Sequence, residues 1–289
     1  MIARDVPRGN SRLALILIAP ALFIVFGVAV IPIGATLWEA FHQHDLRFPW
    51  LGVPFIALGN IAEAAVDPRA GAAALRTIMF AAMSVPLELA LGLALALVMH
   101  RANRVRGLLR VATLLPFAIP TVVAALIWRF VVESTSQQAG AAVLADPVTA
   151  WLPIVVADVW KTTPFVAVLL LAGLQAINEE IYEAARIDGA RASRQFATIT
   201  LPLIAPTLVV AGAFRTLDAL RVFDLPYVMT GGGPGTATEP LSLYAFVVLM
   251  QRLRFGYGSA LSALVFGLAL LVAIASVRVL GRVSVEEGR

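Results

Sequence analysis

The chain has 289 residues, of which 60% are hydrophobic and only 14% are charged, and its formal net charge is +4. Soluble globular proteins carry about 25% charged residues, so this composition excludes an ordinary soluble domain and predicts a protein embedded in a lipid bilayer. The absence of cysteine excludes disulfides and thiolate metal sites.

Six segments are apolar over enough residues, about 20, to cross a bilayer as helices. The first follows Arg4, Arg8 and Arg12 and runs for 26 residues, from Leu13 to Trp38, without a charge. The apolar region of a cleavable signal peptide covers only about 7–15 residues, so we expect this helix to stay in the membrane. The six predicted spans cover residues 13–37, 76–99, 109–131, 152–176, 201–220 and 258–278.

The distribution of basic residues predicts how the spans are oriented. With the N-terminus in the cytoplasm, the cytoplasmic segments carry 13 basic residues and the outer segments carry 5. Basic residues concentrate on the cytoplasmic side of membrane proteins, so we expect both termini to be cytoplasmic. Because the arginines are scattered among apolar spans, we interpret them as topology signals and not as a nucleic-acid surface.

The second span carries one acidic residue, Glu88, two positions after Pro86. A proton relay is one interpretation. An isolated carboxyl in a membrane is more simply explained as a protonated group that is hydrogen-bonded to a neighbour. The sequence alone therefore gives no reason to assign Glu88 a function.

The fourth and fifth spans each carry ionisable residues on one helical face. Positions i, i+3, i+4 and i+7 lie on the same side of a helix. Charged groups inside membranes usually face a cavity or pair with one another, so two interpretations are open: a polar pathway, or intrahelical ion pairs Asp158–Lys161 and Arg215–Asp218. The two sets are Asp158, Lys161, Thr162 and Phe165, and Arg215, Asp218, Ala219 and Val222.

The loop between these spans, residues 178–200, is predicted to form two short helices at the cytoplasmic surface. Asn178 can accept a backbone N–H bond at a helix start. Asp188 and Gly189 indicate a helix end, since glycine adopts the left-handed conformation without steric cost. A second helix over 193–200 would lead into the next span at Leu201–Pro202. Periodicity does not decide whether this element lies on lipid or docks with a partner.

The residues of this loop resemble the EAA loop of the inner-membrane permeases of binding-protein-dependent ABC importers. In that family the loop forms a coupling helix that docks in a cleft of the cytoplasmic ATPase. The resemblance therefore implies ATPase contact, with small residues permitting close approach and the two acidic residues offering acceptors. The matching positions are Glu183, Ala184, Ala185, Asp188, Gly189, Ala190, Phe196, Ile199, Leu201, Pro202 and Pro206.

Further matches indicate the carbohydrate branch of this family. Residues 159–165 (VWKTTPF), 214–224 (FRTLDALRVFD) and 230–234 (TGGGP) resemble the maltose/trehalose-type permeases, in particular the first permease of mycobacterial trehalose importers. The sugar-contacting positions of that branch fall on the two polar faces named above. The resemblance thus implies a di- or oligosaccharide as solute, with trehalose the leading candidate.

The resemblance also implies the architecture and the partners. We expect an all-α integral membrane protein with six transmembrane helices and the type I ABC importer permease fold, in one domain over residues 1–289. It would pair with a second permease of the same fold, a cytoplasmic ABC ATPase dimer and an outer sugar-binding protein or lipoprotein, in the lipid of a bacterial inner membrane. ATP and Mg²⁺ would bind to the ATPase, and no cofactor, metal or catalytic residue is expected on this chain.

Other functions have weaker support in the residues. There is no GxxxxGK[ST] phosphate loop, so any ATP hydrolysis belongs to another chain. His42, His44 and Asp45 make only a poor metal motif. Two rival functions are an ion-coupled secondary transporter, although the internal repeats frequent in such folds are not evident, and an integral membrane enzyme. A permease for another solute, such as glycerol phosphate, is the alternative within the class.

Overall fold

The computed structural model describes residues 11–101, 106–135 and 142–286. Within these residues the chain is almost entirely helical, as expected, with two isolated β-bridges, His42–Phe55 and Asp45–Arg254. Four of the described helices are long and apolar enough to cross a membrane, and up to six crossings result if each of two bent helix pairs counts as one. Which helix ends face the cytoplasm stays a prediction.

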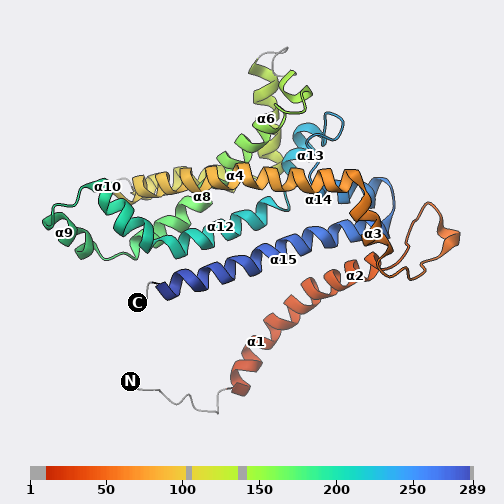
Figure 1. Ribbon diagram of the computed structural model, residues 1–289, viewed down its shortest axis with the longest axis horizontal. Coiled ribbons are helices and arrows are strands. Elements are labelled where there is room, and N and C mark those ends of the chain that lie inside the picture. Colours follow the sequence, from red (N-terminus) through yellow and green to blue (C-terminus); the bar gives the residue numbers. More distant parts are fainter. Residues whose placement is uncertain (1–10, 102–105, 136–141, 287–289) are drawn as a thin grey trace.

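The first span leaves the helical bundle. It consists of α1 (Ser11–Val25), the π-helical turn η2 (Phe26–Val30) and α2 (Ile31–Ala40). Only its α2 end packs on α15 (Phe255–Glu286), so that α1 diverges from the other helices (Figure 1). Its large apolar side chains, such as Phe23 and Val28, are exposed in the isolated chain. A hydrophobic surface of this length fits lipid or another membrane helix.

The centre of the fold is the contact between α4 (Pro68–Arg101) and α8 (Trp151–Gln175). Small residues allow these helices to approach closely, as is common in membrane proteins. A Cβ on Gly92 of α4 would lie 2.5 Å from Val166 Cγ1 of α8. Gly173, near the end of α8, similarly makes room for Thr207. The buried face of α4 repeats every three or four residues and includes Thr77, Phe80, Ala81, Ser84, Glu88, Gly92, Ala96 and Met99.

The third predicted span, 109–131, lies on two helices that meet at an angle of 93°, α5 (Arg106–Ala118) and α6 (Thr121–Thr135). Pro120 stands at the break. Proline has no N–H to donate and disfavours helical backbone in the residue before it, which explains why the helix ends here. In Figure 1, α6 stands away from the long axis of the bundle, beside α13 (Asp224–Thr230).

The predicted start of the fifth span lies at a bend in the chain. Leu201 and Pro202, which were expected to start the span, open a short helix at the end of a continuous helical segment over residues 192–203, and the chain then bends by 64° at Ile204. The elements are α9 (Glu179–Ile187), α10 (Ala192–Gln195), the π-helical turn η4 (Phe196–Thr200), α11 (Leu201–Leu203) and α12 (Ala205–Ala219).

Both prolines of this region lie where a missing N–H costs little. Leu201 N–H donates to the carbonyl of Phe196, five residues back, so the π turn carries the helix up to Pro202 in the first turn of α11. Pro206 then occupies the first turn of α12. Which of the two prolines opens the membrane span stays a prediction.

At the end of the bundle opposite α9, hydrogen bonds to the carboxylate of Asp67 connect three helices. Asp67 precedes α4 and accepts from Arg69 N at 2.8 Å, which caps the helix. Its other oxygen accepts from the hydroxyls of Tyr244 (2.6 Å) and Tyr257 (2.5 Å). Asp67 therefore connects α4 to α14 and α15. The elements at this end are η3 (Pro49–Leu51), α3 (Gly59–Val66), α14 (Leu241–Phe246) and η5 (Val247–Gln251).

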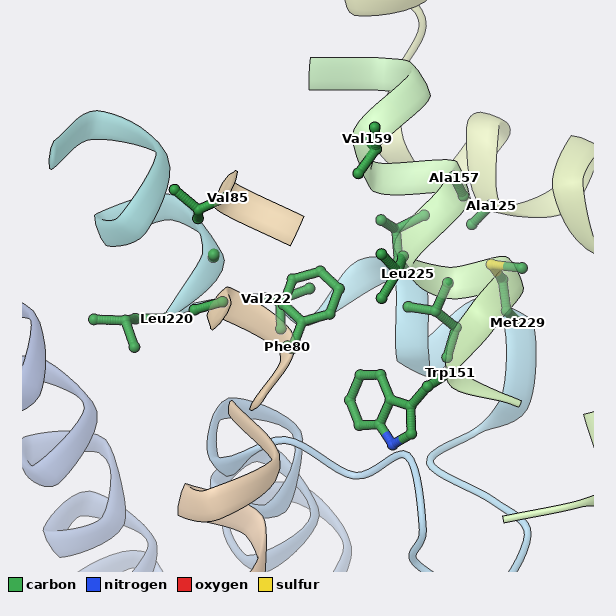
Figure 2. Packing of buried hydrophobic residues seen from close by; sticks show 14 residues of the cluster. Phe80, Val85, Ala125, Trp151, Ala157, Val159, Leu220, Val222, Leu225 and Met229 are labelled. Carbon is green, nitrogen blue, oxygen red and sulfur yellow. The ribbon is translucent and has the colours of Figure 1, made fainter. Parts of the chain in front are cut away.

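The main apolar core lies between α4, α6, α8 and α13. Figure 2 shows Phe80 and Trp151 with Val222, Leu225 and Met229 grouped around them. Trp151 also donates its indole N–H to the carbonyl of Ala237 at 2.9 Å, which satisfies the polar end of a buried ring. This core supports one side of the cavity described next.

Candidate functional site

A cavity of about 230 Å³ lies where α4, α8, α12 and the beginning of α13 meet. One side is apolar, because Phe80, Ala219, Val222 and Leu225 belong to both the cavity wall and the core. Most of the other lining residues are polar or charged. They are Phe117, Thr121, Asp158, Lys161, Thr162, Arg215, Asp218, Arg221, Phe223 and Asp224.

The structure brings together seven of the eight residues predicted to line a polar pathway: Asp158, Lys161, Thr162, Arg215, Asp218, Ala219 and Val222. Phe165 is the exception, because its ring stacks on Phe117 at 5.5 Å between centroids and meets Phe214 edge-on at 6.3 Å. The two helical faces inferred from spacing thus converge on one space, while the role of these residues stays a proposal.

Arg215 is the centre of the charged wall. It is 3% exposed and donates to carboxylates on three helices. Its Nη2 donates to Glu88 at 2.8 Å and to Asp158 at 3.0 Å, and its Nη1 donates to Asp218 at 2.6 Å. Its Nε donates to the second oxygen of Glu88. Paired charges of this kind are the form in which ionised groups persist inside membranes.

These contacts decide between the two intrahelical ion pairs that the sequence suggested. Arg215 and Asp218 do pair within α12. Asp158 and Lys161 do not pair with each other; Asp158 instead binds Arg215 of α12. Arg215, across the helix interface, is closer to Asp158 than Lys161 on the same helix is. Which residue pairs with Asp158 therefore depends on how the helices pack.

Lys161 is held at the broken third span. Its side chain is buried, at 8% exposure. Its ammonium lies 3.4 Å from the carbonyl oxygen of Phe117 and 5.3 Å from the centre of the Phe117 ring. Phe117 is the penultimate residue of α5, where carbonyls lack partners from a following turn. A cation is favoured at such a helix C-terminus, so Lys161 stabilises the end of α5 as well as lining the cavity.

Glu88 is the residue that the sequence analysis underestimated. The sequence favoured a carboxyl hydrogen-bonded to a neighbour, and Glu88 does have such neighbours: it accepts two hydrogen bonds from Arg215 and a third from Thr162 at 2.9 Å. It is fully buried and does not line the cavity; it lies behind Arg215 and Thr162. The available signal was the unusual count of ionisable residues in three spans, which favours a shared cluster.

The loop between α8 and α12 forms a protruding bihelical element, called the knob here and defined as residues 178–200. Asn178 accepts from Glu180 N and caps α9, as predicted. Gly189 has φ +76°, and Ala190 N donates to Ala185 O while Gly189 N donates to Arg186 O, so α9 ends in a Schellman motif. Figure 1 shows α9 at one end of the molecule.

The knob exposes the residues that its resemblance assigns to coupling. Glu183, Ala184, Asp188 and Gly189 are exposed, and Ala185, Ala190 and Phe196 are half-buried. Leu201 and Pro202, just beyond the knob, are also exposed. Ile187 at the end of α9 is 86% exposed, an unusual position for a large apolar side chain. An apolar tip of this kind indicates a surface that a partner or lipid covers.

A side-chain hydrogen bond links the two halves of the knob. The Tyr182 hydroxyl lies 2.9 Å from the Thr200 hydroxyl, and Thr200 is buried. Beside this contact is an open cavity of about 560 Å³ that includes Leu97, Arg101 and Leu174 in its wall. The knob therefore touches the ends of α4 and α8 around a space and is not embedded in them.

The histidines of the loop between α2 and α3 have local partners. His42 Nδ1 lies 2.7 Å from the carbonyl oxygen of Trp38, and His44 Nδ1 lies 2.8 Å from a carboxylate oxygen of Glu39. In the part of the chain that the structure describes, no three side chains of the types His, Cys, Asp or Glu gather closely enough to hold a metal ion.

Residues 88–285 match the family model described as "Binding-protein-dependent transport system inner membrane component". The trehalose/maltose transport system permease protein MalF of Thermococcus litoralis is 40% identical, with 93% of this chain and 94% of that protein covered. The trehalose transport system permease protein SugA of Mycobacterium tuberculosis is also 40% identical, with 94% and 90% covered.

The fold is similar to that of a solved transporter. A chain of a bacterial ABC transporter involved in the import of the acidic polysaccharide alginate superposes with a TM-score of 0.77 at 21% sequence identity. The match covers 94% of this chain and 96% of that chain. At this identity the likeness concerns the fold, and it includes the helices that surround the cavity.

Proposed function

This chain belongs to the family of binding-protein-dependent transport system inner membrane components, and we propose that it is a permease subunit of an ATP-driven importer for a di- or oligosaccharide, with trehalose the first candidate. Relatives named for trehalose and maltose transport cover nearly the whole chain at 40% identity. The observation that carries the proposal is the cavity among membrane helices, whose wall combines an apolar side with hydroxyl, ammonium and carboxylate groups.

The chemistry of this wall suits a sugar. Sugar hydroxyls both donate and accept hydrogen bonds, and the C–H surfaces of the ring are apolar. Asp218 accepts, Lys161 donates, and Thr162, whose single hydrogen is given to Glu88, can accept. Phe80 and Val222 offer apolar surface on the opposite side. We assign the sugar-contacting role to the seven predicted residues that line the cavity and exclude Phe165 from direct contact.

The size of the cavity supports a shared site. Pockets that enclose a small ligand usually measure about 300–1,000 Å³, and this one measures about 230 Å³. A second permease of the same fold would contribute the remaining wall, so that each chain forms half of the translocation pathway. The exposed apolar surface of α1 and α6 is available for that partner and for lipid.

The knob would couple this pathway to ATP hydrolysis on a separate chain. Its exposed small residues and acidic groups are suited to a cleft in a cytoplasmic ATPase dimer, which would bind ATP and Mg²⁺. A sugar-binding protein would deliver solute at the other end of the bundle, near α13 and α14. ATPase closure would bias the helices between two arrangements that bind the sugar differently, as allosteric coupling requires.

We test this function by reconstituting the chain with its partner chains in proteoliposomes and measuring ATP-dependent uptake of radiolabelled trehalose. Asp218→Asn removes a charged acceptor and keeps its shape. Hydrogen bonds to charged groups contribute about 1.5–3 kcal/mol, so uptake efficiency should fall about tenfold to a hundredfold. Asp146→Asn, an exposed carboxylate outside the cavity, is the matched control and should leave uptake unchanged.

Three outcomes would contradict the proposal. Equal uptake by the wild type and Asp218→Asn would remove the cavity from the pathway. Uptake that continues without ATP and collapses with an uncoupler would indicate an ion-coupled transporter instead. Uptake of glycerol phosphate in place of any sugar would keep the transporter class and correct the solute.

A further inference from the structure

The hydrogen-bond donors of Arg215 are nearly exhausted by the protein. A guanidinium has five N–H donors and cannot lose its charge in a protein. Two of the five go to Glu88, one goes to Asp158 and one goes to Asp218. Among the described residues this leaves one hydrogen, on Nη1, for a solute. Arg215 lines the cavity, yet it has little capacity to bind an anion there.

Glu88 accepts two of these four hydrogen bonds, more than either of the other two carboxylates. It takes the Nε edge of the guanidinium with both oxygens, a bidentate arrangement that is among the strongest hydrogen-bonded contacts in proteins. Glu88 is fully buried, whereas the side chain of Asp218 is 49% exposed. Asp218 can therefore exchange Arg215 for a solute hydroxyl, because its carboxylate can still be hydrogen-bonded to water. Glu88 cannot release Arg215 without becoming an unpaired buried charge.

The balance of charge around the cavity depends on the same residue. Three carboxylates and three cations line the cavity, so its wall is neutral by formal charge. Glu88, directly behind the wall, adds one negative charge. Of the three cations, Arg215 and Arg221 are paired with carboxylates, and Lys161 is directed at the carbonyl of Phe117. An entering anion would meet three carboxylates and a guanidinium with one N–H left, so that the ammonium of Lys161, with one of its three N–H groups directed at Phe117, is the main donor that remains.

From this geometry we propose that Glu88 is a positioning residue that makes the cavity selective against anionic solutes, because it holds and saturates Arg215. The inference deepens the proposed function and rests on it for the position of the solute. An uncharged sugar is not repelled by a wall rich in acceptors, because its hydroxyls donate hydrogen bonds to Asp218 and Asp158. A phosphate or carboxylate ester of the same sugar would need the donors that Glu88 occupies.

The experiment compares two probes that differ by one anionic group, trehalose and trehalose 6-phosphate. Equilibrium binding of each radiolabelled probe is measured on the assembled permease–ATPase complex in nanodiscs. The binding protein is omitted, so that its own selectivity does not hide that of the membrane site. The variants are Glu88→Gln, Glu88→Asp and the control Glu239→Gln. Glu239 is an equally buried carboxylate, bound by Arg69 at 2.6 Å at the outer end of the bundle.

The wild type should bind trehalose 6-phosphate at least about tenfold more weakly than trehalose, a difference that one charge contact readily produces. Glu88→Gln keeps the shape, removes the charge and frees Arg215, so binding of the phosphate ester should strengthen about tenfold. Glu239→Gln should leave both affinities unchanged. Glu88→Asp keeps the charge but draws the carboxylate back by one methylene, which releases donors of Arg215, so binding of the ester should strengthen in part.

The proposal is overturned if Glu88→Gln assembles and still excludes trehalose 6-phosphate, or if Glu239→Gln gains the same binding. A merely structural role for Glu88 would weaken both probes together. Should Glu88→Gln fail to assemble, Glu88→Asp decides: ester binding as weak as in the wild type, although Arg215 is no longer saturated, would refute the proposal. A wild type that binds no trehalose would count against the proposed solute alone, because the gain of ester binding is measured without it.

Discussion

Replacing Gly189 by leucine tests whether the knob transmits force. Gly189 follows the C-terminus of α9 with φ +76°, in the left-handed region that side chains disfavour. A Cβ built at this position meets no atom within 4 Å. The chain itself therefore has room for the leucine, and any steric conflict must come from a partner.

The intrinsic cost of the substitution follows from the backbone. A non-glycine residue in the left-handed conformation costs about 1–2 kcal/mol, which loosens the turn between α9 and α10 without unfolding the spans. Gly189→Ala carries this backbone cost with little added volume. Gly189→Leu adds a side chain that a close-fitting ATPase cleft has no space for. We expect Gly189→Ala to keep most coupling and Gly189→Leu to lose nearly all of it.

Gly231 provides a matched control at the other end of the molecule. It ends α13 with φ +64° and likewise has no atom within 4 Å of a built Cβ. Gly231→Leu thus carries the same backbone cost and the same side chain. The assay measures membrane insertion, copurification of the ATPase, and sugar-stimulated ATP hydrolysis in the reconstituted complex. All three variants should insert, and only Gly189→Leu should lose the ATPase. Because Gly231 ends α13, where the sugar-binding protein is proposed to deliver solute, Gly231→Leu is compared by insertion and ATPase copurification alone.

Two results would refute this reasoning. Normal stimulated hydrolysis in Gly189→Leu would show that the knob does not enter a close-fitting cleft. Equal losses in Gly189→Ala and Gly189→Leu would assign the effect to the turn and not to docking.

Two further predictions concern stability and are measured by thermal unfolding of the detergent-solubilised complex. Gly92→Ala should lower the free energy of unfolding by about 1–3 kcal/mol, because its Cβ would overlap Val166. Gly71→Ala on the same helix has open space and should cost nothing. Equal melting temperatures for the two variants would contradict the close approach of α4 and α8. Burial raises the pKa of Asp67, but hydrogen bonds from Tyr244, Tyr257 and backbone N–H groups outweigh it and lower that pKa below the ordinary value of 3.8. The stabilisation from Asp67 is thus complete above about pH 3.8 and is lost as the pH falls through the native pKa, so the decline below that pH should be smaller in Asp67→Asn, and an equally steep decline would argue against the assignment.

The helical class and most local features of this chain follow from its sequence. Hydropathy locates the apolar segments, because a bilayer accepts only long runs of apolar residues or charges that are paired. Asn178 and Gly189 mark the ends of α9, because capping and left-handed turns depend on contacts within a few residues. Spacing alone also places Asp158 with Lys161 and Thr162 on one face of α8.

Tertiary packing decides how these faces meet. Arg215 binds Glu88, which lies 127 residues earlier in the chain. Helical spacing cannot predict a contact between residues so far apart in the sequence. Asp158 pairs with Arg215 and not with Lys161, because the guanidinium of α12 reaches it across the helix interface. Likewise, Pro202 and Pro206 both carry the signal for a helix start and both lie in a first helical turn, and only the structure shows the 64° bend that separates the two helices. Local chemistry acts over three or four residues, whereas the charged cavity exists only where separate helices come into contact.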